Sequence, residues 1–301
     1  MSQRFGRRRL FGLALAAGVP SASASPVPPI IDSHVHVWKI DPRYPFIKQA
    51  TMAPPDRDAT PEMLLGLMKA HQVKKSVLVQ VSHHGWDHSY LIDTLRRYPR
   101  DFIAVARVNP EDPRAPEQLS QLCAEHGFRG LRLNVQPDAG FDWVRGPLLL
   151  PLLRRCEGLH IPLALQTKGP RLGELLPLFE RVPDLTVIID HMADVAPDDA
   201  RAINALLAFA RLPRVHVKIS HTWLVSKQAY PFPDAQALAK RVYDRFGPRR
   251  LLFGSDWPGV EKHCGYAKAL AMVQSEMKFL TPDDRRWILG QTAAGIWKGL
   301  I

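Results

Sequence analysis

The stretch Asp32-Ser33-His34-Val35-His36-Val37-Trp38 places two histidines two positions apart in an apolar run. Near the other end of the chain, Gly254-Ser255-Asp256-Trp257-Pro258 follows a second apolar run. Side chains alternate between the two faces of a strand, so His34 and His36 project the same way. Two adjacent imidazoles offer two positions of a metal's coordination sphere, and Asp256 offers a carboxylate ligand or a general base. This pairing of motifs indicates a hydrolase built on a closed barrel.

The composition is that of a chain that buries a large core. Its 301 residues are 46% hydrophobic and carry a formal net charge of +11, and this length permits two domains or one α/β barrel. Basic residues are scattered over expected helix faces, as at Arg96-Arg97 and Arg249-Arg250. Such scatter favours a small anionic substrate, or simply a basic surface, over nucleic acid. The odd number of cysteines and the lack of CxxC spacing argue against a disulfide framework for Cys123, Cys156 and Cys264.

Residues 1–24 have the pattern of a targeting segment that is separate from the fold. A basic region is followed by an apolar run over residues 10–19 and by Ala22-Ser23-Ala24, a small-residue cleavage site. Within it, Arg8-Arg9-Leu10-Phe11-Gly12-Leu13 is similar to a twin-arginine export signal. The apolar run is too short to span a bilayer. We expect a periplasmic protein without stable membrane insertion, whose mature chain begins at Ser25; a basic unstructured N-terminus is the alternative.

Short apolar runs alternate with helical patterns along the rest of the chain. Eight runs read as strands, at residues 30–38, 76–81, 102–108, 130–135, 162–167, 186–191, 215–220 and 251–256. The segments between them show apolar residues at three- and four-residue spacing, and several begin near Pro, Ser or Asp. Strands that alternate with helices imply a parallel sheet. The sequence therefore predicts an α/β fold, a single-domain (β/α)8 TIM barrel over residues 25–301.

Polar side chains gather where these strands end, which separates a barrel from an open doubly wound sheet. They are His34 and His36 on the first run, His83 and His84 after the second, Arg132 and Asn134 on the fourth, Gln166 and Lys168 on the fifth, His191 on the sixth, Lys218 and His221 on the seventh, and Asp256 on the eighth. Residues from so many strands converge only if the strands form a ring, whose carboxyl end carries the active site. The parity of the seventh strand leaves open whether Lys218 or His221 faces the site.

The expected loop after the second strand is rich in side chains suited to recognition. It reads Ser82-His83-His84-Gly85-Trp86-Asp87-His88-Ser89-Tyr90 and would lie over the barrel mouth. We expect His83 and His84 to contact the substrate, with Trp86 or Trp38 stacking on a ring. A helix cap in a solvated loop is the alternative. His221-Thr222-Trp223, after the seventh strand, is a similar and weaker candidate.

These motifs resemble the amidohydrolase superfamily, in the amidohydrolase-related branch that contains 2-pyrone-4,6-dicarboxylate lactonase and sugar lactonases. The resemblance rests on the motifs at residues 32–38 and 254–258, which are specific, and on three weaker ones, Val77-Leu78-Val79-Gln80, Gly130-Leu131-Arg132 and Asp190-His191. They occur in order over nearly the whole mature chain. The resemblance implies that His34, His36, His191 and Asp256 form the catalytic centre and hold any metal.

Two departures from the superfamily pattern bear on the metal. Binuclear members carry a carbamylated lysine or a glutamate at the end of the fourth strand, where this chain has Arg132 and Asn134. Many members also place a histidine at the end of the fifth strand, where this chain has Gln166. The resemblance therefore implies one divalent metal, with zinc preferred for an imidazole-rich site. The branch also includes lactonases that need no metal.

The expected reaction is hydrolysis of a lactone of a sugar acid or a dicarboxylate. Asp256 would take the proton of the attacking water, while His34, His36 and His191 stabilise the developing charge, with or without a metal. Arg132, with Lys218 or Lys168, would bind a substrate carboxylate. A decarboxylase or an amidase acting on C–N bonds, on the same scaffold, is the alternative enzyme. A non-catalytic protein that binds anions at the barrel mouth is a further alternative.

Overall fold

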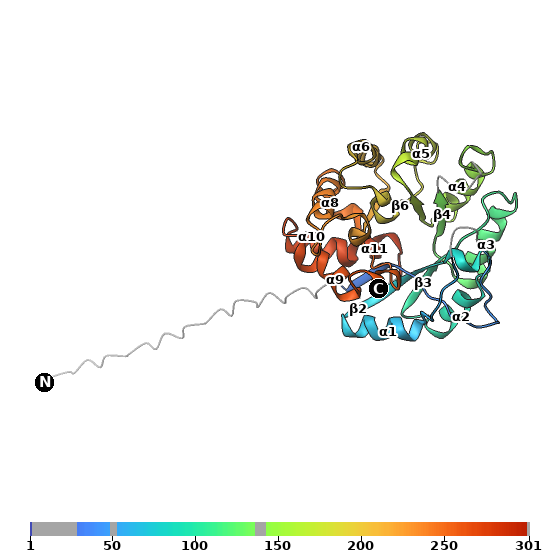
Figure 1. Ribbon diagram of the computed structural model, residues 1–301, viewed down its shortest axis with the longest axis horizontal. Helices are drawn as coiled ribbons and strands as arrows, with labels where there is room; N and C mark the ends of the chain where they lie inside the picture. The colour runs from blue at the N-terminus through green and yellow to red at the C-terminus, as the bar shows by residue number, and fades with distance from the viewer. Residues whose placement is uncertain (2–28, 49–52, 136–142, 300–301) are drawn as a thin grey trace.

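Eight parallel strands lie at the centre of the molecule, and helices surround them (Figure 1). The computed structural model describes Met1 and residues 29–48, 53–135 and 143–299, so the targeting segment predicted at 1–24 lies, except for Met1, outside the described residues. The strands are β1 (Ile30–Val35), β2 (Val73–Val79), β3 (Phe102–Val105), β4 (Leu131–Val135), β5 (Leu163–Thr167), β6 (Val187–Ile189), β7 (Val215–Ile219) and β8 (Leu251–Phe253). All eight fall within or overlap the predicted runs, and most end earlier than predicted.

Two seams join the strands into a ring. Within the ring, β1–β2–β3 form one sheet and β4–β5–β6–β7–β8 another, each with neighbours paired in sequence order. A parallel bridge between Ala106 and Leu131 continues β3 into β4, with the Arg132 amide donating to the Ala106 carbonyl at 2.7 Å. The other seam joins β1 to the end of β8, where the Asp256 amide donates to the His34 carbonyl at 2.9 Å. The predicted single-domain (β/α)8 barrel is confirmed.

Helices follow the strands, and most of them cover the outside of the ring (Figure 1). They are α1 (Pro61–Ala70), α2 (Ser89–Arg97), α3 (Ala115–His126), α4 (Leu149–Gly158), α5 (Leu172–Phe179), α6 (Ala200–Ala208), α7 (Thr222–Val225), α8 (Pro233–Phe246), α9 (Tyr266–Ala271), α10 (Pro282–Arg286) and α11 (Thr292–Ile296). Thr60, Asp199 and Thr281 cap α1, α6 and α10, because the side-chain oxygen of each accepts a backbone N–H of the first turn. None of the described helices is both long and apolar enough to span a membrane.

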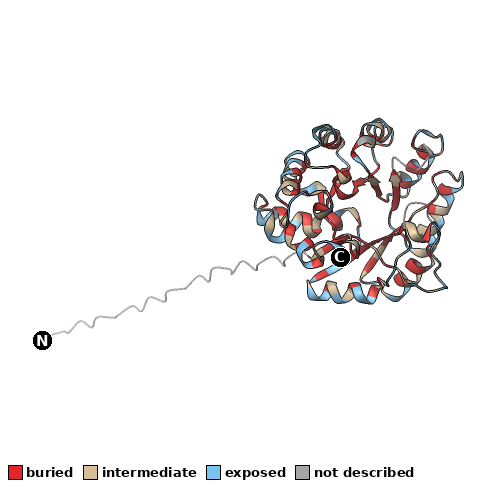
Figure 2. Ribbon diagram, viewed as in Figure 1, coloured by how far each residue is buried: buried red, intermediate tan, exposed pale blue. Residues whose placement is uncertain are grey.

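The strands separate two apolar cores, and most residues of the strands are buried (Figure 2). The larger core lies between the strands and the helices. The smaller one fills the inside of the barrel, as close packing requires, and consists of Ile31, Val77, Val79, Val105, Ala164, Ile188, Leu252, Ala293 and Trp297. Since Ala293 and Trp297 belong to the C-terminal segment, this segment closes the barrel floor at the amino ends of the strands. The active site is therefore expected at the opposite end of the barrel, at the carboxyl ends of the strands.

Candidate active site at the barrel mouth

The first-strand histidines face the barrel axis because β1 is irregular. Ile31 lies in the inner core, and the pairing of β1 with β2 shifts register between Asp32 and Val35. This irregularity lets His34 and His36 both turn inward, where their Nε2 atoms lie 3.3 Å apart. The Nδ1 atom of His36 is 2.7 Å from the carbonyl oxygen of Val79, which can only accept. Nδ1 of His36 therefore carries a proton, and its Nε2 faces the site, 3.3 Å from Oδ1 of Asp256.

Three further site residues stand in left-handed turns directly after strands. His191, His221 and Asp256 have φ of 54°, 56° and 54°, a region that side chains other than glycine rarely occupy. Ile188 of β6 and Lys218 of β7 point into the barrel. If side chains simply alternated along each strand, His191 and His221, which lie three positions further on, would face outward. The left-handed turn brings both to the mouth, where their rings stack with centroids 3.5 Å apart. Such strained positions are concentrated at functional sites.

Asp256 lies at the centre of this group, and its two oxygens have different partners. Oδ1 is 3.5, 3.3 and 4.0 Å from the Nε2 atoms of His34, His36 and His191. Oδ2 accepts from Nε2 of His221 at 2.9 Å, while Nδ1 of His221 donates to Asp194 at 2.8 Å. One oxygen is thus fixed by a hydrogen bond, and the other is directed at three imidazoles.

Electrostatics keep Asp256 ionised and His221 protonated. Burial opposes ionisation of Asp256, but the charge of His221 and the hydrogen bonds from His221 and His36 hold the pKa of Asp256 well below its usual range. Burial would likewise lower the pKa of His221, but the charge of Asp256 and the hydrogen bonds to Asp194 and Asp256 raise it to about 10. The two residues form an ion pair in the mouth.

His34 and His191 are neutral. Burial and the charge of Lys218 lower the pKa of His34 well below its usual range, and burial and the charge of His221 do the same for His191. Nδ1 of His191 lies 2.7 Å from the Ser220 hydroxyl, and Nη1 of Arg132, which can only donate, lies 3.4 Å from Nε2 of His34. Nδ1 of His34 lies 3.4 Å from the carboxylate of Asp190.

Beneath these histidines lies a buried layer of ionised groups. Lys218, with no exposed surface, places its Nζ 2.9 Å from Asp190 and 3.0 Å from Nδ1 of His34. Arg132 donates to the side-chain oxygen of Gln166 and places Nε 3.7 Å from Asp190. Charges buried this deeply require partners, and Asp190 serves both cations. Asp190 itself was expected only as part of a motif; its charge-balancing role depends on side chains from three strands, which no local pattern reveals.

Only some of the residues predicted to bind substrate face the interior of the barrel. Arg132 and Lys218 point into the barrel, and both Lys218 and His221 face the interior, so the two candidates of the seventh strand are not exclusive. The ring of His83 packs 6.2 Å from that of Trp38, and Trp86 is 48% exposed at the rim. His84 is only 3% exposed and packs on Phe46, with Nδ1 3.4 Å from the Pro45 carbonyl. Lys168 directly precedes the short helix Gly169–Arg171.

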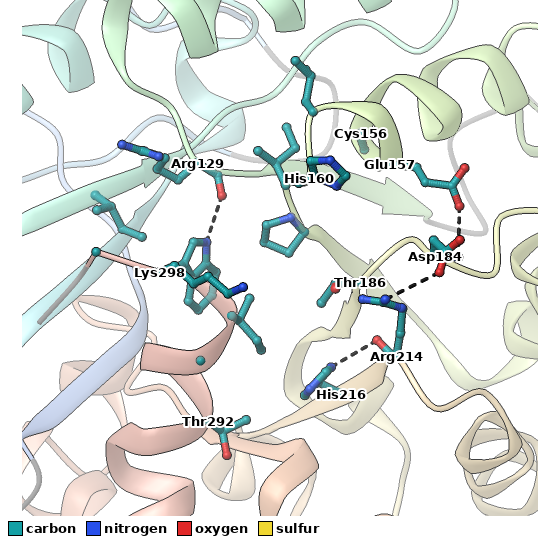
Figure 3. A pocket seen from close by; sticks show the side chains of 18 of the residues that line it. Arg129, Cys156, Glu157, His160, Asp184, Thr186, Arg214, His216, Thr292 and Lys298 are labelled. Atoms are coloured by element: carbon teal, nitrogen blue, oxygen red, sulfur yellow. Dashed lines mark hydrogen bonds and ion pairs between the residues drawn. The ribbon is translucent and has the colours of Figure 1, made fainter.

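A cavity of about 740 Å³ lies at the opposite end of the barrel, around the amino ends of the strands (Figure 3). Its lining includes Arg129, His160, Asp184, Arg214 and Lys298, with Asp184 3.5 Å from Arg214. None of the histidines and carboxylates described above borders it. The cavity is therefore separate from the candidate active site.

The amidohydrolase family model matches residues 31–299, which is nearly all of the described chain. The chain belongs to the amidohydrolase family. The match begins in β1, the strand that contains His34, and runs beyond the last helix, so the family fold includes every element of the barrel and of the site. The resemblance inferred from the motifs is confirmed.

Similar proteins fall in the same family. The L-fucono-1,5-lactonase of Burkholderia ambifaria is 30% identical over 278 residues, covering 89% of this chain and 95% of that protein. The 4-sulfomuconolactone hydrolase of Hydrogenophaga intermedia is 28% identical over 240 residues, covering 78% and 75%. A solved amidohydrolase from Burkholderia multivorans with bound zinc superposes with a TM-score of 0.76 at 24% identity, covering 89% and 99%.

Proposed function

We propose that this amidohydrolase is a lactonase, which opens a cyclic ester by adding water to its carbonyl. The observation that carries the proposal is the position of Asp256 Oδ1, which is ionised, faces three imidazole nitrogens, and has its partner oxygen fixed by His221. A positioned carboxylate of this kind accepts a proton from water. The names of two similar proteins, a fuconolactonase and a sulfomuconolactone hydrolase, support a lactone as the substrate.

The donor set fits one divalent cation. Nε2 of His34, Nε2 of His191 and Oδ1 of Asp256 belong to a group whose ligand atoms all lie within 4.8 Å of one another, and His36 adds a further Nε2 at its edge. Lone pairs on neutral imidazoles and a carboxylate repel one another unless a proton or a cation lies between them. Imidazole nitrogen and carboxylate oxygen are the ligands that zinc prefers. We infer that His34, His36, His191 and Asp256 hold one divalent metal, zinc by preference.

The chain's own residues account for the proton transfers. Asp256 removes a proton from water as it attacks the lactone carbonyl, and then returns that proton to the leaving alkoxide. His221 holds Asp256 in the orientation that directs Oδ1 at the three imidazoles. Arg132 lies beside His34 and orients the substrate. A bound cation would polarise the carbonyl and lower the pKa of the attacking water.

The alternative reactions are less well supported. The decarboxylases that share this fold are represented among solved structures by a 2,6-dihydroxybenzoate decarboxylase at 16% identity, a level that speaks for the fold alone. The two curated relatives named above act on lactones according to their names. A non-catalytic anion-binding protein would have no need of an ionised carboxylate with one oxygen free among three imidazoles.

The experiment is hydrolysis of a lactone panel by the mature chain, followed as acid release before and after treatment with a chelator. We expect turnover that falls on chelation and returns with Zn²⁺. Asp256→Asn should lower kcat by about 100-fold or more, the contribution of a positioned general base. Turnover that is insensitive to the chelator would remove the metal from the proposal, and absence of turnover on every lactone would overturn the lactonase itself.

We also propose that residues 1–24 direct export through the twin-arginine route to the periplasm. The proposal is supported by Arg8-Arg9 ahead of a short apolar run and a small-residue cleavage site. Replacing both arginines by lysine should leave the uncleaved chain in the cytoplasmic fraction. An unchanged periplasmic fraction would contradict this route.

A further inference from the structure

The guanidinium of Arg107 stands at the barrel mouth, on the first inward position beyond the end of β3, and has no acidic partner among the described residues. Ile103 and Val105 of that strand pack in or against the core inside the barrel, and Arg107 continues the same alternation toward the mouth. Its backbone N–H donates to Nε2 of His88 at 3.1 Å, which fixes the residue at this point of the chain. Arg107 therefore extends from the wall of the barrel into the region of the site.

The surroundings of Arg107 differ from those of the two buried cations, Lys218 and Arg132. Its guanidinium carbon lies 5.0 Å from the ring centroid of Trp86, and its Nε is buried without a hydrogen-bond partner. Among the described residues, no carboxylate forms an ion pair with it, whereas Lys218 and Arg132 share Asp190. Burial, with a further contribution from the charge of Arg132, lowers the pKa of Arg107 to about 10. Even so, the group is fully charged at neutral pH.

Arg107 is half-buried, its Nε is buried without a partner, and no carboxylate of the described residues offsets its charge, so a partner for the guanidinium is expected from a bound substrate. Trp86 covers a face of the guanidinium and leaves the N–H groups at its edge for a planar, two-oxygen partner. The adjacent strand β4 adds a second unpaired group, because the amide oxygen of Asn134 is also buried without a partner. Two incomplete polar groups on neighbouring strands mark this side of the mouth as a place where part of the substrate binds.

We propose that Arg107 binds an anionic group, a carboxylate or sulfonate, carried by the lactone substrate outside the ring that is opened. This inference rests on the proposed lactonase function and narrows it. The names of the two relatives differ on this point, since a fuconolactone is neutral and a sulfomuconolactone is charged. Arg107 places this chain with enzymes for charged lactones. Its role is substrate specificity, and the chemistry of ring opening remains with Asp256.

The test compares a charged lactone with a neutral one, muconolactone with its free carboxylate and the methyl ester of the same lactone. Ring opening by the mature chain is followed by chromatography, and kcat/KM is taken for both. We expect the wild type to favour the acid, and Arg107→Gln to lower this preference by about 30-fold or more, the scale of losing one partner of a desolvated charge pair. Arg107→Lys should restore part of it, because the charge remains and the bidentate geometry is lost.

Arg129→Gln is the matched control. It removes the same charge from an exposed arginine that borders the cavity at the other end of the barrel, and the acid-to-ester ratio should stay at the wild-type value. The inference is overturned if the wild type shows no preference for the acid, or if Arg107→Gln keeps the wild-type ratio.

A wild type that opens neither lactone would instead contradict the proposed function, and binding then decides the inference. Calorimetric titration with citrate, a polycarboxylate with no lactone to open, needs no turnover. Citrate binding that Arg107→Gln abolishes and Arg129→Gln retains would support an anion site at Arg107. Equal binding to both variants, or no binding to the wild type, would overturn it.

Discussion

At the scale of single residues, the site depends on the carboxylate of Asp256, whose two oxygens have different partners. His221 binds Oδ2 of Asp256 at 2.9 Å and is itself held by Asp194 at 2.8 Å. We expect His221→Phe, which keeps a ring against His191, to lower kcat by about 10- to 100-fold with a smaller change in KM, as for other groups that orient a reactive residue. Steady-state kinetics on the best lactone of the panel measure this.

A double-mutant cycle distinguishes positioning from a separate role for His221. If His221 acts only by orienting Asp256, His221→Phe should cost almost nothing in the Asp256→Asn background, because residues that act as a unit are not additive. Additive losses would show that His221 contributes to catalysis independently of Asp256.

His88 links pH to stability at a point away from the metal ligands. Burial lowers the pKa of His88 from 6.5 to about 4 in the folded protein. As the pH falls below about 6.5, this histidine binds a proton in the unfolded chain but not in the folded one. The free energy of unfolding therefore decreases until the pH reaches about 4, by about 3 kcal/mol at most. His88→Gln should flatten urea-denaturation stability over this window. A slope equal to that of the wild type, or an equal change in the exposed His263→Gln, would contradict this.

The sequence identified the residues of the site better than their orientations. His34, His36, His191 and Asp256 were predicted from strand ends and motifs, and the structure brings them together. His221 stayed ambiguous because alternation assumes a regular strand, whereas a left-handed residue after β7 turns its side chain inward. Arg107 was not predicted, because its significance depends on the lack of an acid beside it among the described residues, which only three-dimensional packing reveals.

At the scale of elements, the end of β8 must pass unusually close to β1. A Cβ placed on Gly254 would lie 2.7 Å from the Cβ of His34, nearer than side chains pack. Gly254→Ala should therefore displace His34 or the strand, costing about 1–3 kcal/mol of stability as overpacking does, and lowering kcat/KM. Gly66→Ala is the control, because nothing lies within 4 Å of its added methyl on α1. Wild-type activity in Gly254→Ala would show that the seam has room.

Strands were predicted more accurately at their starts than at their ends. The expected runs at 186–191 and 251–256 extend to the catalytic side chains, whereas β6 ends at Ile189 and β8 at Phe253. The difference has a physical reason. A ladder needs extended backbone, and the left-handed residues His191 and Asp256 break it at the point where the site requires their side chains to turn inward. In the sequence, His191 and Asp256 therefore read as the last residues of strands, whereas in the structure they lie in turns beyond the strand ends.

At the scale of the whole molecule, the barrel is closed by polar contacts beneath the site. Oδ1 of the fully buried Asp32 accepts the Ser255 amide at 2.9 Å, and Oδ2 accepts the hydroxyl of Tyr266 at 3.0 Å. One carboxylate thereby links β1, the end of β8 and helix α9. The number of strands followed from the sequence, but this clamp did not, because its partners are more than 200 positions apart. It belongs to the closed ring and not to any one element.

Tyr266→Phe tests this clamp with the removal of a single oxygen. The variant leaves one buried carboxylate oxygen of Asp32 without its partner, so the free energy of unfolding in urea should fall by about 1–3 kcal/mol. Tyr98→Phe removes an exposed hydroxyl that bonds Glu62, and should change stability by less than about 0.5 kcal/mol. If the two variants unfold alike, the seam is held by its backbone hydrogen bonds alone. A loss confined to Tyr266→Phe shows that the ring needs a side chain from outside the sheet to stay closed under the catalytic histidines.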